Sequence, residues 1–203
     1  MRSRAAAATL LEAGFKEVYS MEGGINAWNG RVAEGAPQSG MAYFAPAATP
    51  EELAALAWRL EGGSRKFYSA LADTVTDPEA KDLYRQLAKA EEHHQTALLK
   101  LYEEFSGKAS APGFPGALLP PGDEDGDTME GGMRVSEALE WAKGKKTTDI
   151  LELSLSLETN AYDLYIKMER RMQDEHSAQV FHVLSAEEKQ HLERLSALLE
   201  KRM

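Results

Sequence analysis

The stretch LAKAEEHHQTAL, residues 87–98, places two glutamates and two histidines in succession inside a segment that otherwise favours an apolar helix. Leu87, Glu91, His94, Leu98 and Leu101 follow one another at steps of four, three, four and three residues, so they lie on one face of a helix. One glutamate and one histidine are therefore expected to point inward with the leucines. Burying an ionised carboxylate without compensation costs several kcal/mol, so something positive must lie close to it.

The same pattern recurs 97 residues further along the chain, which indicates an internal duplication. The pairs aligned by this offset, without a gap, are Leu60/Leu157, Glu61/Glu158, Phe67/Leu164, Tyr68/Tyr165, Tyr84/Phe181, Leu87/Leu184, Glu91/Glu188, His94/His191, Leu98/Leu195 and Leu101/Leu198. Neighbouring polar positions do not repeat, since Lys89 aligns with Ala186 and His93 with Gln190. Surface charges need not repeat, so the paired glutamates and histidines indicate two hairpins of equal design related by a pseudo-twofold axis.

Helix signals divide residues 49–203 into four long helices. The first is expected from Pro50, capped by Thr49, to about residue 73, and the second from the cap Asp77 to about residue 105. The third is expected over about 147–172 and the fourth over about 177–201. Short turns join the helices within each hairpin, whereas a long break rich in glycine and proline, then a short helix within 135–144, joins the hairpins. The predicted fold is therefore all-α, a four-helix bundle with one long crossover.

Two further features bear on the crossover. Gly62 and Gly63 interrupt the first helix, where each glycine costs about 1 kcal/mol relative to alanine, and we expect them to leave room for the crossover or a small ligand. The acidic stretch DEDGDTMEGGMR, residues 123–134, fails the spacing of a calcium loop, because Thr128 stands where glycine is needed and Arg134 where a glutamate belongs. This stretch is expected to be a flexible acidic loop.

The duplicated glutamates and histidines fit a site for two metal ions. Two divalent cations carry enough positive charge to balance four carboxylates. A glutamate and a histidine three residues apart lie about 4.5 Å apart along a helix and face the same way, so both reach one ion. The expected ligands are Glu61, Glu91, His94, Glu158, Glu188 and His191. Tyr68 and Tyr165 are expected either to donate hydrogen bonds to these carboxylates or only to pack in the core.

With Glu61, EEHH at 91–94, Glu158 and EEKQH at 187–191, residues 49–203 resemble the ferritin-like di-iron carboxylate superfamily, nearest to rubrerythrin-type and bacterioferritin-type domains. The resemblance implies two metal ions, iron first, with manganese and zinc as alternatives. It also implies a homodimer and an oxidoreductase that reduces peroxide or dioxygen with an external electron-donor protein. The alternatives are iron binding or storage without turnover, and a di-metal protein whose metal is structural.

Two departures from the rubrerythrin pattern modify this expectation. Rubrerythrins usually carry a further glutamate three residues after the third-helix ligand, but Ala161 occupies that position and Ser64 its repeat equivalent. Peroxide chemistry is less well supported for this reason. Rubrerythrins also often carry a cysteine-ligated rubredoxin module, whereas this chain has no cysteine. Electrons must then come from a partner, and disulfides, cysteine-ligated zinc and thiol nucleophiles are excluded within the chain.

The stretch MRSRAAAATLLEAGFKEVYSMEGGINAW, residues 1–28, resembles the last part of a rhodanese-like domain: an alanine-rich helix, Gly-Phe, a strand at 17–20 and a GG-x-x-x-W turn. The catalytic cysteine of that family would precede Met1, so no sulfurtransferase activity is expected. The predicted organisation is a partial rhodanese-like α/β fragment over 1–35, a linker over 36–48 and the bundle over 49–203. Joining sulfur-handling and di-iron modules suggests a role in oxidative or sulfide-linked stress.

Composition limits the remaining classes of protein. The 203 residues carry a formal net charge of −10, which argues against a nucleic-acid partner held through phosphates. A hydrophobic content of 43% is enough to form a core. No stretch approaches the roughly 20 apolar residues of a membrane span, and the N-terminus lacks the pattern of a signal peptide. A cytoplasmic protein is the expectation.

Overall fold

The computed structural model describes residues 49–110, 114–115, 126–170 and 172–203, together with Gly14 and Lys16. Apart from those two residues, the predicted rhodanese-like fragment and the linker lie outside the described residues. The resemblance of the N-terminal segment to a rhodanese therefore stays a prediction.

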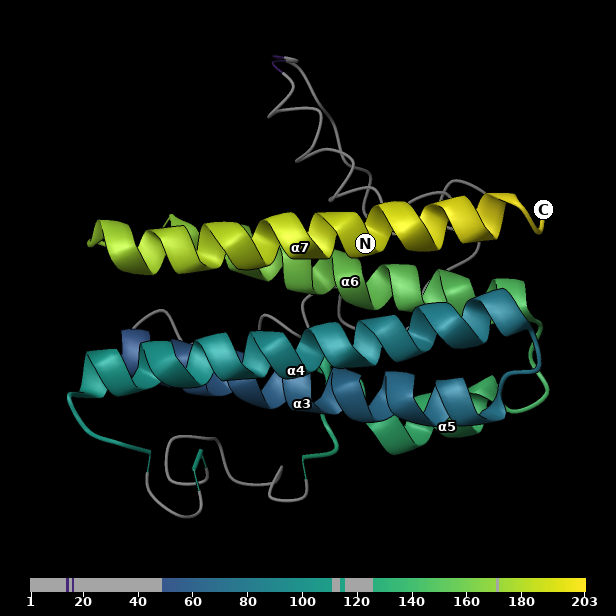
Figure 1. The fold of residues 1–203 in the computed structure, drawn as a ribbon, viewed down its shortest axis with the longest axis horizontal. Coiled ribbons are helices and arrows are strands. Elements are labelled where there is room, and N and C mark those ends of the chain that lie inside the picture. Colours follow the sequence, from purple (N-terminus) through teal and green to yellow (C-terminus); the bar gives the residue numbers. More distant parts are fainter. Residues whose placement is uncertain (1–13, 15, 17–48, 111–113, 116–125, 171) are drawn as a thin grey trace.

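Four long helices form the bundle, and the predicted all-α fold is confirmed (Figure 1). Helices α3 (Pro50–Thr74) and α4 (Pro78–Ser106) make one hairpin, and helices α6 (Thr147–Glu169) and α7 (Glu175–Glu200) make the other. The two hairpins lie as two layers with their helices side by side. Within the described part of the chain, no helix has the length and apolar character that a bilayer span requires.

Polar caps begin these helices close to where the sequence predicts. Thr49 and Glu52 form a reciprocal capping box at the start of α3, in which each side chain accepts a backbone N–H of the other residue. Asp77 caps α4 with its side chain, as predicted. Asp174 caps α7 in the same way, so this helix begins at Glu175, two residues before the expected start.

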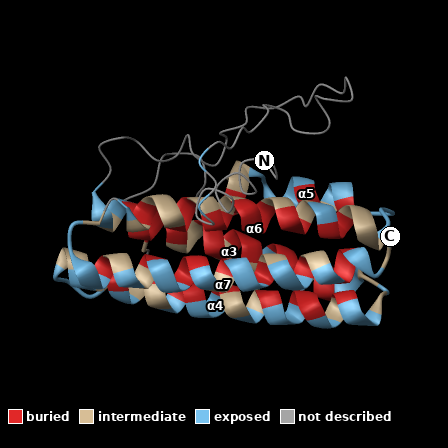
Figure 2. Ribbon diagram, turned by 90° about the horizontal axis from the view of Figure 1, so that it is seen from above, coloured by how far each residue is buried: buried red, intermediate tan, exposed pale blue. Residues whose placement is uncertain are grey.

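The core consists of two apolar clusters, one toward each end of the bundle. One cluster joins the C-terminal half of α3 and the N-terminal half of α4 to the N-terminal half of α6 and the C-terminal half of α7. The other joins the remaining halves of the four helices. Buried residues accordingly run along the inward faces of the helices (Figure 2). Exchanging the hairpins exchanges the clusters, which is the arrangement that a pseudo-twofold axis across the bundle requires.

The crossover does not pass freely over the surface. It carries a 3₁₀ turn, η2 (Glu130–Gly132), and a short helix, α5 (Val135–Ala142), that packs on α3. Met129 is fully buried in the core, and Thr128 pairs with Arg134 in an isolated antiparallel bridge. The prediction of a flexible acidic loop is therefore wrong for residues 126–134, because a buried methionine and backbone hydrogen bonds hold this segment against the bundle.

Gly63 makes the close packing of the crossover possible, as the sequence suggested for the glycine pair. A Cβ at Gly63 would lie 2.2 Å from the carbonyl oxygen of Thr128 and 2.9 Å from the Cα of Met129. Both distances are far below van der Waals contact, and both involve backbone that cannot rotate away. A Cβ at Gly62 would instead meet the flexible end of the Gln95 side chain, at 2.7 Å.

Gly63→Ala is expected to destabilise the metal-free protein, although alanine favours a helix by about 1 kcal/mol over glycine. The added methyl group forces the crossover away from α3, and overpacking of this kind costs typically 1–3 kcal/mol. Urea unfolding followed by circular dichroism measures the difference. Gly62→Ala is the matched control and should stay within about 1 kcal/mol of wild type, because only the Gln95 side chain must move. Equal stability of the two variants would contradict the proposed contact.

Candidate metal centre

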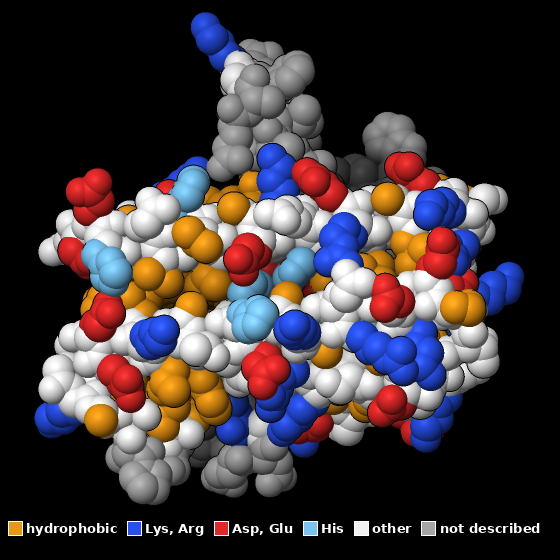
Figure 3. Space-filling model, viewed as in Figure 1, with side chains coloured by type: hydrophobic (Ala, Val, Ile, Leu, Met, Phe, Trp, Pro, Cys, Tyr) orange, Lys and Arg blue, Asp and Glu red, His pale blue; other side chains and the backbone are white. Residues whose placement is uncertain are grey.

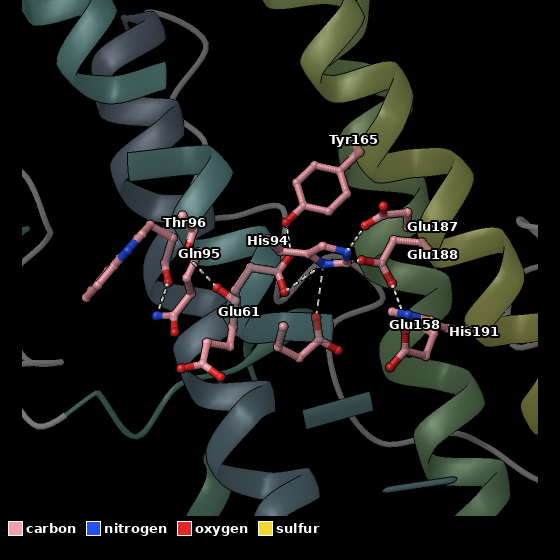
Figure 4. Close-up of polar contacts among 12 residues, drawn as sticks. Glu61, His94, Gln95, Thr96, Glu158, Tyr165, Glu187, Glu188 and His191 are labelled. Atoms are coloured by element: carbon pink, nitrogen blue, oxygen red, sulfur yellow. Dashed lines mark hydrogen bonds and ion pairs between the residues drawn. The ribbon is translucent and has the colours of Figure 1, made fainter. Parts of the chain in front are cut away.

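The structure brings all six predicted ligands together inside the bundle. Figure 4 labels Glu61, His94, Glu158, Glu188 and His191 among them. Glu61 comes from α3, Glu158 from α6, and one glutamate–histidine pair from each of α4 and α7. All six side chains are buried. Their ligand atoms form two overlapping groups, each with all atoms within 4.8 Å of one another: Glu61, Glu91, His94 and Glu188, and Glu91, Glu158 and His191.

The distances divide the four carboxylates into two kinds. Glu188 spans both histidines, with Oε1 3.0 Å from Nδ1 of His94 and Oε2 3.3 Å from Nδ1 of His191. Glu91 belongs to both groups of potential ligands. Glu61 lies 3.4 Å from Nδ1 of His94, and Glu158 lies 3.0 Å from Nδ1 of His191. Two carboxylates are thus placed to be shared by two ions, and each of the others lies beside one histidine.

Two buried tyrosines hold the outer carboxylates from across the bundle. The hydroxyl of Tyr68 on α3 donates a hydrogen bond to Oε1 of Glu158 on α6, and the hydroxyl of Tyr165 on α6 donates one to Oε1 of Glu61 on α3. Burial and the negative charge of Glu158 raise the pKa of Tyr68, so its proton stays in place. Each tyrosine ring also packs in one of the apolar clusters, and both roles considered for these residues therefore hold.

The charges of the site are unbalanced without added cations. Within the described residues, the ion pairs of the four carboxylates involve only His94 and His191, and no lysine or arginine reaches them. Burial, followed by the charge of Glu91, raises the pKa of Glu61. Burial opposes protonation of the histidines, but the surrounding carboxylates prevail, so that the pKa of His94 rises and that of His191 reaches about 11.

Unsatisfied oxygen atoms show that this residue set fits metal ions. Oε2 of Glu91 and Oε1 of Glu188 have no hydrogen-bond partner among the described residues, although each lies 3.0 Å from Nδ1 of His94. A single N–H cannot serve both of these oxygens and Glu61 as well. Carboxylate oxygens and imidazole nitrogens in this mixture suit iron, manganese or zinc. Two divalent cations would satisfy the orphaned atoms and balance the four carboxylates.

Glu187, a half-exposed residue outside the six predicted ligands, contacts one of the two predicted histidines. Its Oε2 lies 2.8 Å from Nε2 of His94, on the side of the ring that faces away from the site. A carboxylate on the outer nitrogen fixes the orientation of a ligating imidazole and increases its basicity. The equivalent of Glu187 in the first half of the chain is Ala90, so the contact supports only one of the two histidines. Because it does not repeat, the duplication could not reveal it.

Glu187→Ala is expected to weaken binding of one metal ion by about 10-fold and to leave the other nearly unchanged. Loss of such a supporting contact typically costs 10–100-fold in affinity, and Glu187 is half exposed, which favours the lower end. Titration with Co²⁺, followed by visible absorption, resolves the two binding steps. Glu92→Ala is the control, because Glu92 is exposed and lies 3.8 Å from Arg65 at its nearest ion pair. Two equally weakened steps would contradict a role confined to His94.

A groove lies on the seam between α4 and α7. It encloses about 360 Å³, and its lining includes His93, Thr96 and Lys100 of α4 and His176 and Val180 of α7. Figure 3 shows histidine side chains gathered along this seam. His93 is exposed, and His176 pairs with Glu104 at 2.8 Å.

Fold and site together define a ferritin-like four-helix bundle with a duplicated carboxylate–histidine centre. The sequence profile of the rubrerythrin family matches residues 52–118 and 149–203, which are more than half of the chain and include all six predicted ligands. The chain belongs to the rubrerythrin family, and this membership supports a di-iron protein.

A solved structure agrees with this assignment at the level of the fold. A hypothetical protein from Pyrococcus furiosus matches with a TM-score of 0.59 and 24% sequence identity, over 82% of this chain and 95% of that chain. At this identity the likeness supports the architecture alone. The search of curated proteins gives no match.

Proposed function

We propose that the protein is a di-iron oxidoreductase of rubrerythrin type that reduces hydrogen peroxide or dioxygen with electrons from an external donor. The observation that carries the proposal is the buried site itself, in which four carboxylates and two imidazoles converge and no described lysine or arginine neutralises them. Family membership favours iron among the metals that suit these ligands.

Each residue of the site has a distinct part in this proposal. Glu61 with His94 would hold one ion, Glu158 with His191 the other, and Glu91 and Glu188 would be shared. When bound, two iron ions supply two electrons, one each, which together with two protons reduce hydrogen peroxide to two molecules of water. Tyr68 and Tyr165 keep the outer carboxylates in place through their hydroxyls, and the two apolar clusters exclude water from both ends of the site.

The sequence bears on both the electron donor and the oxidant. The chain has no cysteine, so it cannot ligate an iron–sulfur centre of its own, and we propose a separate donor protein. Ala161 replaces the extra acid of rubrerythrins that use peroxide, so dioxygen stays beside peroxide as an oxidant. The predicted homodimer also stays a prediction.

Anaerobic loading with Fe²⁺, followed by rapid mixing with hydrogen peroxide or dioxygen, tests this function. We expect two Fe²⁺ per chain and oxidation in the protein that is much faster than oxidation of free Fe²⁺ in the same buffer, with repeated turnover when a chemical reductant is supplied. Binding of many iron ions per chain without reductant-dependent turnover would favour storage instead. Two bound ions that neither oxidise nor exchange would favour a structural metal. Either result would contradict the proposed function.

A further inference from the structure

Glu130, in the crossover, is a buried carboxylate that the four helices do not contribute. Its side chain is only 4% exposed, and its Oε1 has no hydrogen-bond partner among the described residues. It lies outside the part of the chain that matches the rubrerythrin profile, and it belongs to neither helical hairpin. An isolated buried carboxylate is costly, and an apolar side chain of similar size is usually better tolerated at such a position.

Three glycines allow the crossover to carry Glu130 into the bundle. Gly63 lets the backbone of Thr128 and Met129 approach α3. Gly131 and Gly132, which directly follow Glu130, adopt φ values of +79° and +73°, a conformation that residues with a Cβ rarely take. A Cβ at Gly131 would lie 2.4 Å from the side-chain nitrogen of Asn160 on α6. The turn is therefore fitted closely between α3 and α6.

The turn that carries Glu130 contacts equivalent positions in the two hairpins. Gly63 and Asn160 are 97 residues apart, so they occupy equivalent positions in the two hairpins. They follow Glu61 and Glu158 by two residues each. A segment that contacts both positions passes close to the pseudo-twofold axis, between the two halves of the metal centre. Glu130 is therefore carried by a segment that lies against both α3 and α6 and that belongs to none of the four ligand-bearing helices.

Hydrogen bonds hold the turn around Glu130 in a fixed conformation. The backbone N–H of Met129 donates to the carbonyl of Met133, and that of Gly132 to the carbonyl of Met129, both at 3.0 Å. Just before the turn, Asp127 accepts hydrogen bonds from the backbone and hydroxyl of Ser136, at 3.0 and 2.6 Å. A carboxylate on such a support has little freedom to turn away toward solvent.

The electrostatic neighbours of Glu130 are the predicted ligands. Burial raises the pKa of Glu130, and the negative charges of Glu91, Glu188 and Glu158 raise it further. Glu130 in turn contributes to the raised pKa of Glu61. Glu130 thus interacts electrostatically with all four helix carboxylates, and a hydrogen bond from its own backbone acts in the opposite direction on the pKa of Glu130.

We propose that Glu130 is a fifth carboxylate of the metal centre and serves as a seventh protein ligand when the ions bind. The proposal rests on the di-metal site proposed above and adds a ligand from the crossover. It accounts for a buried, unpartnered oxygen, for the glycines that bring it there, and for its place between the two halves of the site.

Co²⁺ titration of the full-length metal-free protein and its Glu130→Gln and Glu130→Met variants tests the proposal. Wild type should bind two Co²⁺, and both variants should lose about 10-fold or more in affinity for at least one ion. Their visible absorption bands at saturation should change, because these bands report the number and geometry of ligands. Glu137→Gln is the matched control: it removes the same charge from an exposed position seven residues away and should behave as wild type.

Thermal unfolding of the same metal-free samples separates a ligand from a structural residue. The Glu130 variants should melt at the wild-type temperature or above it, because they remove a buried carboxyl group whose ionised form is disfavoured by burial and by the neighbouring carboxylates. Wild-type affinity and wild-type absorption bands in both variants would overturn the inference while leaving the di-metal site intact, and so would weaker binding accompanied by a lower melting temperature. Absence of Co²⁺ binding to the wild-type protein would overturn the metal centre itself.

Discussion

Glu91→Gln is expected to raise the melting temperature of the metal-free protein and to remove most of the stabilisation that metal ions provide. After burial, the negative charge of Glu91 is the largest cause of the raised pKa of both Glu61 and Glu130. An amide of the same shape removes this repulsion without leaving a cavity. The same change removes a carboxylate that belongs to both groups of ligand atoms, so binding of both ions should suffer.

The two effects have opposite signs, which makes the experiment decisive. At a free concentration 100 times the dissociation constant, one bound ion stabilises the folded state by roughly 2.7 kcal/mol. For a domain of this size, 1 kcal/mol corresponds to roughly 2–4 °C in melting temperature. Two ions should therefore raise the melting temperature of wild type by about 10–20 °C. Glu91→Gln should show a small fraction of this increase, from a higher starting temperature.

Differential scanning calorimetry with Co²⁺ and with a chelator measures both quantities. Glu92→Gln is the control, because Glu92 is the exposed neighbour of Glu91 and makes the same change of net charge. It should leave both melting temperatures at their wild-type values. A Glu91→Gln protein that is less stable without metal and equally stabilised by metal would show that Glu91 is an ordinary structural residue.

The duplication explains why so much of this fold could be predicted from the sequence. A fully buried glutamate is rare, so the recurrence of glutamates with histidines at the same offset in two hairpins identifies positions that share one environment. The offset of 97 residues located all six residues that the structure gathers, including Glu61, which lies at the border of its apolar stripe. Capping residues then placed the helix starts, because Thr49 and Asp77 satisfy free N–H groups that only a helix terminus presents.

The duplication also explains what the sequence could not reveal. Glu130 belongs to the connection between the two repeats and has no equivalent, and Glu187 aligns with Ala90. Neither residue could therefore be distinguished from the surrounding surface acids by recurrence. In the crossover, burial depends on Gly63 of a different element, and only the three-dimensional packing relates the two. A signal was nevertheless present, since two helix-breaking glycines at Gly62 and Gly63 needed a steric reason.

Metal binding is expected to release protons, and metal affinity is expected to rise steeply with pH. In the metal-free protein the pKa of His191 is about 11 and that of His94 is also raised, because the carboxylates outweigh the effect of burial. Both rings are therefore protonated at neutral pH, and Nδ1 of each must lose its proton before it can bind an ion. The pKa of Glu61 is also raised, by burial and by Glu91. At acidic pH, metal binding should therefore release a further proton from Glu61.

The stability of the metal-free protein should depend on pH in the opposite direction. A histidine whose pKa is higher in the folded than in the unfolded state stabilises the fold fully below its unfolded pKa, and this contribution falls as pH rises toward the folded pKa. For His191 that window runs from 6.5 to about 11. Each proton retained only by the folded state changes the stability by about 1.4 kcal/mol per pH unit, so the melting temperature without metal should fall steadily above pH 6.5.

Melting curves between pH 6 and 9, with a chelator and with saturating Zn²⁺, test both directions on one protein. The curve with chelator should fall with pH, and the increment due to Zn²⁺ should grow. Calorimetric titration in buffers of different ionisation enthalpy should count about two protons released at pH 7. His191→Asn should reduce the count by about one and flatten the chelator curve, whereas His176→Asn, at an exposed position, should do neither. If the melting temperature with chelator rises between pH 6.5 and 9, the carboxylates of the site do not hold protons on His94 and His191. The charge balance proposed for the metal centre would then be wrong.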